Sequence, residues 1–237
     1  MTTFIENSPM REQIEFLRQT RQRFKTTGAI APSSRFLAGA MTRHLAVHDR
    51  PASILEIGPG TGAVTRRIVK LLKPQDRLDL VELNDDFAAI LERRFRMDAS
   101  FHRVAEQTTL SNCSLQEFRT DLQYDFIISG LPLNNFSAEM VQEIFEIYFR
   151  LLAPGGVLSY FEYMYVRPIR KLVTGGAEKS RLQTLDEIMG AYRSRHHIRT
   201  DWVFVNIPPA WVQHLRNDDT AAASETAEET IVVGTAS

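Results

Sequence analysis

The chain has 237 residues and a mass of 27.0 kDa, which suits one α/β domain with extensions and excludes both a mini-protein scaffold and several large domains. Hydrophobic residues make up 43% and charged residues 24%, so collagen-like and wholly disordered chains are excluded too. The net charge of −1, from 28 Lys and Arg against 29 Asp and Glu, is unlike that of a dedicated nucleic-acid-binding protein, although a total near zero can hide opposed local patches.

Cysteine usage and hydropathy limit the compartment and the kind of site. Cys113 is the lone cysteine, which excludes a disulfide framework and a multi-cysteine zinc site, so we expect no metal and a reducing, cytoplasmic location. The amino-terminal sequence lacks the apolar stretch of a signal peptide, and nowhere do roughly 18 to 20 apolar residues run without interruption. We therefore expect any membrane contact to be peripheral, at the inner face.

Residues 1–50 are predicted to form a helical extension. Between residues 10 and 25 the apolar side chains fall near helical spacing, at Met10, Ile14, Leu17 and Phe24. Basic residues outnumber acidic ones in the same segment: Arg11, Arg18, Arg21, Arg23 and Lys25. This pattern predicts a basic amphipathic helix. It either docks on the main domain with a solvated basic face, which is the simpler interpretation, or faces a membrane surface or RNA.

Residues 51–216 are predicted to form one doubly wound α/β domain. Short apolar runs alternate with helical patterns, which is typical of a parallel sheet built from strand-helix-strand units. Ser137 is expected to cap the helix that Pro154, Gly155 and Gly156 stop. The expected strands of this region are residues 53–57, 77–82, 109–114, 126–129 and 157–161.

The carboxy-terminal third contains a basic segment, one predicted strand and an acidic tail. It is locally basic after Met164, and Gly175 and Gly176 predict a turn or mobile loop. The apolar run 202–207 is predicted to be the last strand, ended or redirected by two prolines. We expect His196 and His197 at the surface without a metal partner. Residues 217–237 contain five acidic and no basic residues, which predicts a disordered acidic tail.

The strongest local signal is the stretch SILEIGPGTGAVTRRI, where a strand runs through a glycine turn into a helix. Gly58, Gly60 and Gly62 allow the backbone to turn sharply and approach a ligand closely. Three glycines alone fit a nucleotide site or a structural turn equally well. Glu82 favours the nucleotide site, because it ends the next strand 20 residues after Gly62, where a carboxylate can bind ribose hydroxyls.

The glycine spacing is GxGxG, and neither a dinucleotide GxGxxG nor a P-loop GK[ST] is present. The stretch EIGPGTG, followed by VEL at the end of the next strand, resembles the class I S-adenosylmethionine-dependent methyltransferases. The resemblance implies a seven-stranded Rossmann-like methyltransferase sheet with S-adenosylmethionine as cofactor. It also implies that Glu82 holds the ribose and Glu56 orients the methionine end, within a set of cofactor contacts made by Glu56, Gly58, Gly60, Thr61, Gly62, Glu82, Ser114 and Ser129.

The fourth expected strand ends in YDFIISGLPLNNF. Adenine N6 methyltransferases carry an Asn or Asp and then an aromatic residue here, but this chain has Gly130 and Leu133 at those places. A base amine is weakly nucleophilic and needs the side-chain carbonyl, and the flipped base needs the aromatic face. A basic alkylamine needs neither, so methylation of an RNA base is disfavoured and no nucleic-acid partner is expected.

Four further stretches in the same order, TGAIAPSSRFLA, SGLPLNNF, LAPGGVLSYFEY and VFVNIPPAWVQHLR, resemble the bacterial phospholipid N-methyltransferases, which share their overall plan with the rRNA adenine dimethylases. The resemblance covers nearly the whole chain except the acidic tail. It implies methyl transfer to the amine of phosphatidylethanolamine or of an aminolipid such as ornithine lipid. Where relatives have GDA after the third strand, this chain has Asn112, Cys113 and Ser114, so Ser114 or a backbone carbonyl has to take over the contact with the adenine amino group. Cys113 itself is expected to be a small buried filler.

The inferred mechanism is direct displacement at the sulfonium methyl by a neutral amine, with alignment supplying much of the rate. Because an alkylammonium is protonated at neutral pH, the site must also accept a proton. Candidate catalytic residues follow the fifth strand, with Tyr163 and Tyr165 on one face and Glu162 on the other. Tyrosine rings can also hold a cationic product through cation-π contact. Ordinary half-buried strand aromatics, Tyr160 among them, are the structural alternative.

Substrate contacts are expected outside the sheet. Arg167, Arg170 and Lys171 are candidates for binding lipid phosphate, and a merely solvated basic loop is the alternative. Ser33, Ser34 and Arg35 are placed in a loop after the amphipathic helix, where they can close over the cofactor. Two alternatives to a lipid enzyme stay open: a soluble methyltransferase for a small amine, protein or rRNA, and a non-catalytic S-adenosylmethionine-binding scaffold.

Overall fold

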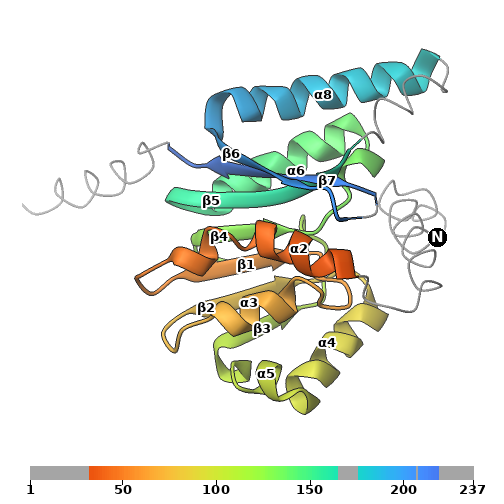
Figure 1. The fold of residues 1–237 in the computed structure, drawn as a ribbon. Coiled ribbons are helices and arrows are strands. Elements are labelled where there is room, and N and C mark those ends of the chain that lie inside the picture. Colours follow the sequence, from red (N-terminus) through yellow and green to blue (C-terminus); the bar gives the residue numbers. More distant parts are fainter. Residues whose placement is uncertain (1–31, 165–175, 207, 219–237) are drawn as a thin grey trace, which may run out of the picture.

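The computed structural model describes residues 32–164, 176–206 and 208–218, which form one sheet with helices on both faces (Figure 1). The sheet has seven strands in the order β3-β2-β1-β4-β5-β7-β6. Strands β1 to β5 pair in parallel, and β7 lies antiparallel between β5 and β6. The predicted doubly wound, mostly parallel sheet is confirmed.

The strands are β1 (Ser53–Ile57), β2 (Arg77–Val81), β3 (Thr108–Ser111), β4 (Tyr124–Ser129), β5 (Leu152–Tyr163), β6 (His197–Val203) and β7 (Ala210–Arg216). The α-helices are α2 (Pro32–Met41), α3 (Thr65–Leu71), α4 (Asp85–Met97), α5 (Ala99–His102), α6 (Ala138–Leu151) and α8 (Gly176–His196). Three short 3-10 turns are η1 (Leu45–Val47), η2 (Ala105–Gln107) and η3 (Leu133–Asn135). None of these helices is long and apolar enough to cross a membrane.

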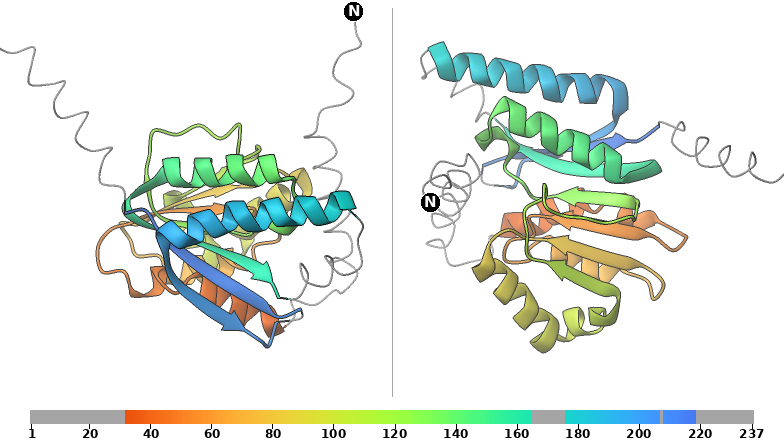
Figure 2. Two further views of the ribbon diagram at one scale, coloured as in Figure 1. Left: turned by 90° about the horizontal axis from the view of Figure 1, so that it is seen from above. Right: turned by 180° about the vertical axis from the view of Figure 1, so that it is seen from behind.

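Alternation along the strands builds two apolar layers. In β1, Leu55 and Ile57 join the cluster that contains the buried faces of α6 and α8, whereas Ile54 joins the cluster of α2, α3 and α5. Helices α6 and α8 lie side by side over one face of the sheet (Figure 2). Because both faces are covered, the parallel strands read as nearly continuous apolar runs in the sequence.

The helix that leads into β5 begins and ends where its local signals predict. The Ser137 hydroxyl caps α6 by accepting a hydrogen bond from the Met140 N–H at 3.3 Å. The helix ends at Leu151, and β5 starts at once. Its pairing with β4 shifts register between the contacts at Leu152 and Val157, because residues 154–156 carry the predicted Pro-Gly-Gly turn.

Two elements of the carboxy-terminal third differ from the prediction. Gly176 begins α8 rather than a turn, and this 21-residue helix is held by Leu182, Leu185 and Met189, which are fully buried against α6 at helical spacing. The predicted last strand, 202–207, is also wrong. Only Trp202 and Val203 of this run lie in a strand, as the last two residues of the edge strand β6. Residues 204–206 form the turn after it, with Phe204 and Val205 exposed, and β7 follows the prolines.

Three smaller expectations need correction. Ser34 and Arg35 lie within α2 rather than in a loop, because the helix starts at Pro32, a residue that favours the first helical turn. The third strand ends at Ser111, three residues earlier than predicted. His196 is buried, with its ring 4.2 Å from that of Phe149, whereas His197 is exposed as predicted.

Candidate functional site

A glycine loop connects β1 to α3 at the carboxyl edge of the sheet. Gly58, Gly60 and Gly62 have φ values of 66°, 61° and 81°, which side chains rarely adopt. A Cβ atom on Gly58 would lie 2.9 Å from Leu131 Cδ2, a side-chain end that can move, so the positive φ is the stronger reason for glycine there. Thr61, at the tip of the loop, is exposed.

Glu82 ties this loop to the end of β2. Its buried carboxylate accepts hydrogen bonds from the Gly60 N–H at 2.8 Å and from the Asn84 N–H at 2.9 Å. The Asn112 side chain donates to the Glu82 backbone carbonyl at 2.8 Å, which fixes the end of β3 as well. The loop and the ends of β2 and β3 therefore meet at one residue, Glu82, the loop through its carboxylate and β3 through its backbone carbonyl.

Glu56 lies beside this arrangement in the middle of the sheet. Its side chain is buried, and Oε2 has no hydrogen-bond partner among the residues that the structure describes. Burial, strengthened by the charge of Glu82, raises the pKa of Glu56 to about 8. Hydrogen bonding by Thr65 opposes part of this rise in pKa. A buried carboxyl oxygen without a partner is costly unless it serves a ligand, so Glu56 Oε2 is suited to receive a cationic group.

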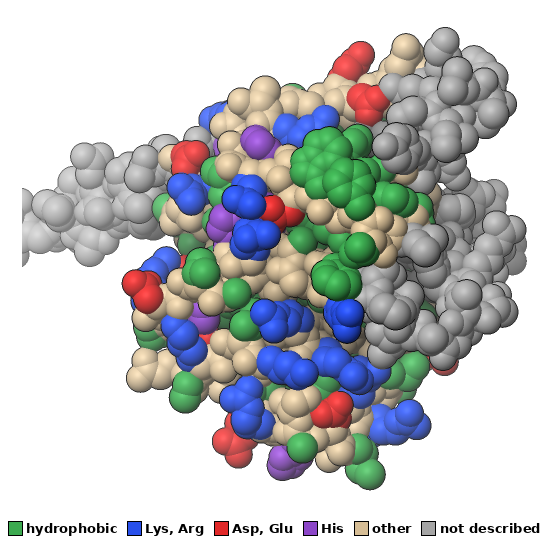
Figure 3. Space-filling view, viewed as in Figure 1, with side chains coloured by type: hydrophobic (Ala, Val, Ile, Leu, Met, Phe, Trp, Pro, Cys, Tyr) green, Lys and Arg blue, Asp and Glu red, His purple; other side chains and the backbone are tan. Residues whose placement is uncertain are grey.

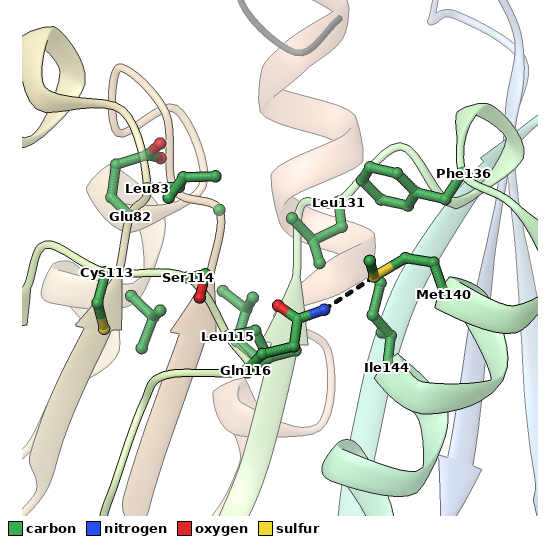
Figure 4. A pocket seen from close by; sticks show the side chains of 13 residues that line it. Glu82, Leu83, Cys113, Ser114, Leu115, Gln116, Leu131, Phe136, Met140 and Ile144 are labelled. Carbon is green, nitrogen blue, oxygen red and sulfur yellow. Dashed lines mark hydrogen bonds between the residues drawn. The ribbon is translucent and has the colours of Figure 1, made fainter. Parts of the chain in front are cut away.

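A cleft opens at the same edge and contains about 620 Å³ of free space, part of it open to solvent (Figure 4). Gly58, Glu82, Cys113 and Ser114 line one part of it, and apolar side chains line the rest, among them Leu83, Leu115, Leu131, Met140 and Ile144. The Gln116 amide donates to the Met140 sulfur at 2.8 Å across the cleft. The lining fits a small ligand with a flat apolar ring and a polar end.

Sequence reasoning missed the apolar wall of the cleft. Leu83 follows Glu82 directly, and Leu115 and Gln116 follow Ser114, so the residues after each strand end were the available signal. Leu131, Met140 and Ile144 carry no such signal, because core leucines and isoleucines look the same in sequence.

Two serines expected to contact the cofactor have other partners for their hydroxyl groups. Ser114 Oγ donates to Glu117 at 2.7 Å, and the Glu117 N–H lies 3.2 Å from Ser114 Oγ, which together form a capping pair. Ser129 Oγ lies 2.5 Å from the buried Tyr148 hydroxyl, and Ser129 is not among the lining residues. Ser114 thus reaches the cleft with its hydroxyl committed, and Ser129 belongs to the core.

The end of β4 excludes a side chain at position 130. A Cβ atom on Gly130 would lie 2.6 Å from the Gly58 carbonyl oxygen, and both atoms belong to backbone. Leu133, three residues on, is buried in the core cluster under α6 rather than exposed as a stacking surface.

Glu162 and Tyr163 are the last two residues of β5, which runs on past the predicted strand 157–161; they lie on opposite faces, and neither lines the cleft. Glu162 is buried and forms an ion pair with Arg193 of α8 at 3.1 Å. Tyr163 packs against the Phe161 ring at 5.1 Å on the other face, and burial raises the pKa of its hydroxyl. Tyr160 is fully buried against Phe145, as a core aromatic.

Of the remaining candidates, Cys113 lines the cleft, Ser34 and Arg35 do not, and the others are undescribed. Arg35 is exposed, with its guanidinium 4.8 Å above the Phe36 ring, and Ser34 precedes it in α2. Cys113 is half-buried, and burial raises the pKa of its thiol, which agrees with a filler rather than a nucleophile. The predicted helix 10–25 and the candidates Tyr165, Arg167, Arg170 and Lys171 lie outside the described residues.

Comparison with known proteins gives a consistent group. A family model described as "Methyltransferase domain" matches residues 55–158. Ornithine lipid N-methyltransferase of Singulisphaera acidiphila is 31% identical over 136 residues, which cover 57% of this chain and 70% of that protein. Ribosomal RNA small subunit methyltransferase A of Pseudomonas aeruginosa is 28% identical over 178 residues, 73% of this chain but only 58% of that protein.

Solved structures share the fold at low sequence identity. N-methyltransferase NodS from Bradyrhizobium japonicum WM9, in complex with S-adenosyl-L-homocysteine, superposes with a TM-score of 0.56 at 17% identity, covering 79% of this chain and 89% of that one. An O-methyltransferase from Bacillus cereus, in complex with SAH, gives 0.59 at 14% identity, covering 90% and 93%.

Proposed function

The chain belongs to the class I S-adenosylmethionine-dependent methyltransferases, and from this premise we propose that it methylates the amine of a membrane lipid head group, that of phosphatidylethanolamine or ornithine lipid. It is a methyltransferase with S-adenosylmethionine as its cofactor. The lipid acceptor is the part that we propose.

The residues around the cleft fit this cofactor. The glycine loop and Glu82 suit a ribose, and the apolar wall made by Leu83 and Leu115 suits an adenine ring. Glu56 does not line the cleft, but it directly precedes the lining residue Ile57, and its Oε2 without a partner suits the ammonium of the methionine end; the ionised form would add negative charge near a sulfonium. When bound, the cofactor supplies an electrophilic methyl group. We propose that Glu56, the loop residues Gly58, Gly60, Thr61 and Gly62, and Glu82 hold it.

One observation carries the choice of acceptor: backbone fills the space beside position 130. With a Cβ atom only 2.6 Å from the Gly58 oxygen, no amide side chain can stand there to activate the exocyclic amine of a base. Leu133 is buried and offers no face on which a flipped base can stack. An alkylamine such as that of a lipid head group requires neither group. The similarity to an ornithine lipid N-methyltransferase supports the same acceptor.

The acceptor amine has to lose a proton, and the candidates Glu162, Tyr163 and Tyr165 differ in their ability to accept it. Glu162 would first have to leave Arg193. Tyr163 is neutral because burial raises the pKa of its hydroxyl, so we propose that it holds the amine with its oxygen or ring face rather than as a phenolate. Tyr165 is proposed for the same role from the sequence alone, as are Arg167, Arg170 and Lys171 for the lipid phosphate and residues 10–25 for peripheral contact with the inner membrane face.

The deciding experiment supplies methyl-labelled S-adenosylmethionine and liposomes that contain phosphatidylethanolamine or ornithine lipid, and separates the products by mass. Label in either lipid identifies the head group and counts the methyl groups. No label in either lipid, with cofactor binding intact, contradicts the proposal. A parallel reaction with small-subunit ribosomal RNA tests the second candidate, which the 28% match to the Pseudomonas aeruginosa enzyme favours.

A further inference from the structure

The turn between β6 and β7 exposes large apolar side chains. Trp202, Phe204 and Val205, here called the hairpin patch, have exposed fractions of 59%, 63% and 57%. The Trp202 ring stacks on the Phe204 ring at 5.6 Å, so the two aromatics form one surface. Figure 3 shows hydrophobic side chains gathered at this end of the molecule. Contiguous exposed apolar surface of this kind marks an interaction site.

The hairpin patch lies at the edge of the sheet where the cleft opens. In the β5–β7 pairing, Ala210 lies opposite Tyr163, and the Met164 N–H donates to the Pro209 carbonyl at 2.7 Å. The turn before Ala210 therefore stands at the carboxyl end of β5. This is the same end of the sheet as the carboxyl ends of β1 and β2, which Gly58 and Glu82 follow, with β4 lying between β5 and β1.

Two other large apolar side chains with high exposure mark the opposite edge. Val47, 76% exposed, lies in η1 before the amino end of β1. Met97, 80% exposed, ends α4, which starts after the carboxyl end of β2 and runs back along the sheet. Exposed apolar side chains are therefore present at both ends of the parallel strands. Among the described residues, the stacked pair of exposed aromatic rings lies at the carboxyl end, where the cleft opens.

Two arginines lie next to the hairpin patch, on the carboxylate that precedes Trp202 in β6. Arg43 and Arg199, each with a half-exposed side chain, share the single buried carboxylate of Asp201 on β6, so this group carries net positive charge. Arg35 lies over Phe36, another exposed aromatic, at the start of α2. Three further exposed basic residues lie on α3: Arg66, Arg67 and Lys70. Figure 3 shows Lys and Arg side chains gathered in the region of α2 and α3.

Stacked aromatics beside arginines match the composition of protein surfaces that sit in the head-group region of an anionic bilayer, where amphipathic rings partition and cations meet lipid phosphates. A second copy of the chain, or another protein, seated on this turn would cover the edge through which a lipid head group has to enter. A bilayer seated there would deliver it.

We propose that the hairpin patch, together with Phe36, inserts into the interface of an anionic lipid bilayer and holds the cleft edge against it. The proposal rests on the proposed function for its purpose, because a lipid acceptor has to reach the cleft from a membrane. It assigns membrane contact to a surface other than residues 10–25.

Tryptophan fluorescence tests the insertion directly, because the chain has two tryptophans and Trp211→Phe leaves Trp202 as the single reporter. In this variant we expect a blue shift of emission with vesicles of phosphatidylcholine and phosphatidylglycerol, quenching by brominated lipid, and a weaker response in phosphatidylcholine alone or at high salt. Unchanged emission from protein that sediments with vesicles would overturn the proposal. So would a blue shift that needs no vesicles and grows with protein concentration, which would indicate a dimer.

Matched double variants test which surface binds. Phe204→Ser with Val205→Ser is expected to lower the vesicle partition constant by roughly tenfold, since apolar area is lost from the inserted surface. Val47→Ser with Met97→Ser removes exposed apolar area at the opposite edge and is expected to leave partition within about twofold of the wild type. Equal losses in the two variants would overturn the assignment. All four side chains are exposed, so both variants should keep the thermal transition of the wild type.

A short-chain aminolipid dissolved below its micellar concentration needs no membrane to reach the cleft. The rate of its methylation therefore tests the proposed function without testing the docking surface. Neither double variant should change that rate. A wild type that methylates the dissolved lipid but shows no Trp202 insertion would refute the docking surface and leave the function standing. Insertion without methylation of any aminolipid would refute the function and leave the surface standing.

Discussion

The Glu82 carboxylate accepts a hydrogen bond from the Gly60 N–H at 2.8 Å, which joins the end of β2 to the turn after β1. The same carboxylate accepts from the Asn84 N–H. Glu82 therefore acts twice: it shapes the glycine loop before a ligand arrives, and it presents negative charge at the mouth of the cleft.

Replacing Glu82 by Gln should weaken cofactor binding more than folding. The amide oxygen can still accept from Gly60, but the charge that strengthens hydrogen bonds to ribose hydroxyls is lost, at a cost of about 1.5 to 3 kcal/mol of binding free energy. Titration calorimetry with S-adenosylmethionine measures the loss. Glu92→Gln, an exposed carboxylate paired with Arg96 on α4, is the control and should leave affinity unchanged. Equal affinity in the two variants would contradict the assignment of Glu82.

Gly130→Ala should destabilise the protein and impair cofactor binding, because the new Cβ atom meets the Gly58 carbonyl oxygen at 2.6 Å and pushes on the glycine loop. We expect a loss of about 1 to 3 kcal/mol in the free energy of unfolding. Gly190→Ala is the matched control: it lies within α8 with no atom near the added methyl group, and should gain about 0.5 to 1 kcal/mol. Urea unfolding distinguishes the two signs, and a neutral Gly130→Ala would show that the β1 and β4 ends can separate.

Glu56 should make stability fall as pH rises. Its pKa is raised by burial to about 8 in the folded chain, so folding takes up a proton between the ordinary value of 4.5 and about 8. In this window the group removes up to about 1.4 kcal/mol of stability per pH unit. The wild type should therefore lose stability between pH 5 and pH 8, whereas Glu56→Gln should not, so the difference in unfolding free energy should shift in favour of the variant as pH rises. The variant should also bind the cofactor more weakly. A stability difference between the two proteins that does not change with pH would refute the buried, protonated state.

His214 should act in the opposite direction. Burial, together with the neighbouring His44, lowers the pKa of His214 to about 4, while Ser159 and Asp201 hold its two ring nitrogens at 2.8 and 3.3 Å. The folded chain keeps the ring neutral, and the unfolded chain protonates it below 6.5, so stability is lost as pH falls from 6.5 to about 4. His214→Gln should flatten this slope in unfolding experiments, and an unaltered slope would show that His214 is not the group responsible.

The sequence predicts the parallel half of the sheet well because its signals are local. Residues 53–57 form β1 as expected, since an apolar run between a turn and a glycine loop has few other solutions in an α/β chain. The antiparallel half was less accessible. In β6 one of the two buried residues is Asp201, a charge that no hydropathy pattern places inside. Its burial is offset by Arg199 on the same strand, by Arg43 in the turn after α2 and by His214 on β7.

The site divides in the same way. Gly58 and Glu82 could be placed at the cleft because backbone conformation and a strand-end carboxylate leave marks in sequence. The partners of Ser129 and Glu162 could not, because Tyr148 and Arg193 lie on helices whose packing is set by the whole fold.

The position of β7 between β5 and β6 constrains how the chain is made. β6 leaves the ribosome before β7, yet its neighbour in the sheet is β7, so it has no edge to join until the last strand exists. β6 can therefore complete its pairing only once β7 exists, either as a hairpin with β7 or after β7 has paired with β5. A chain that stops before Ala210 loses two strands rather than one, while every residue that lines the cleft has already been synthesised.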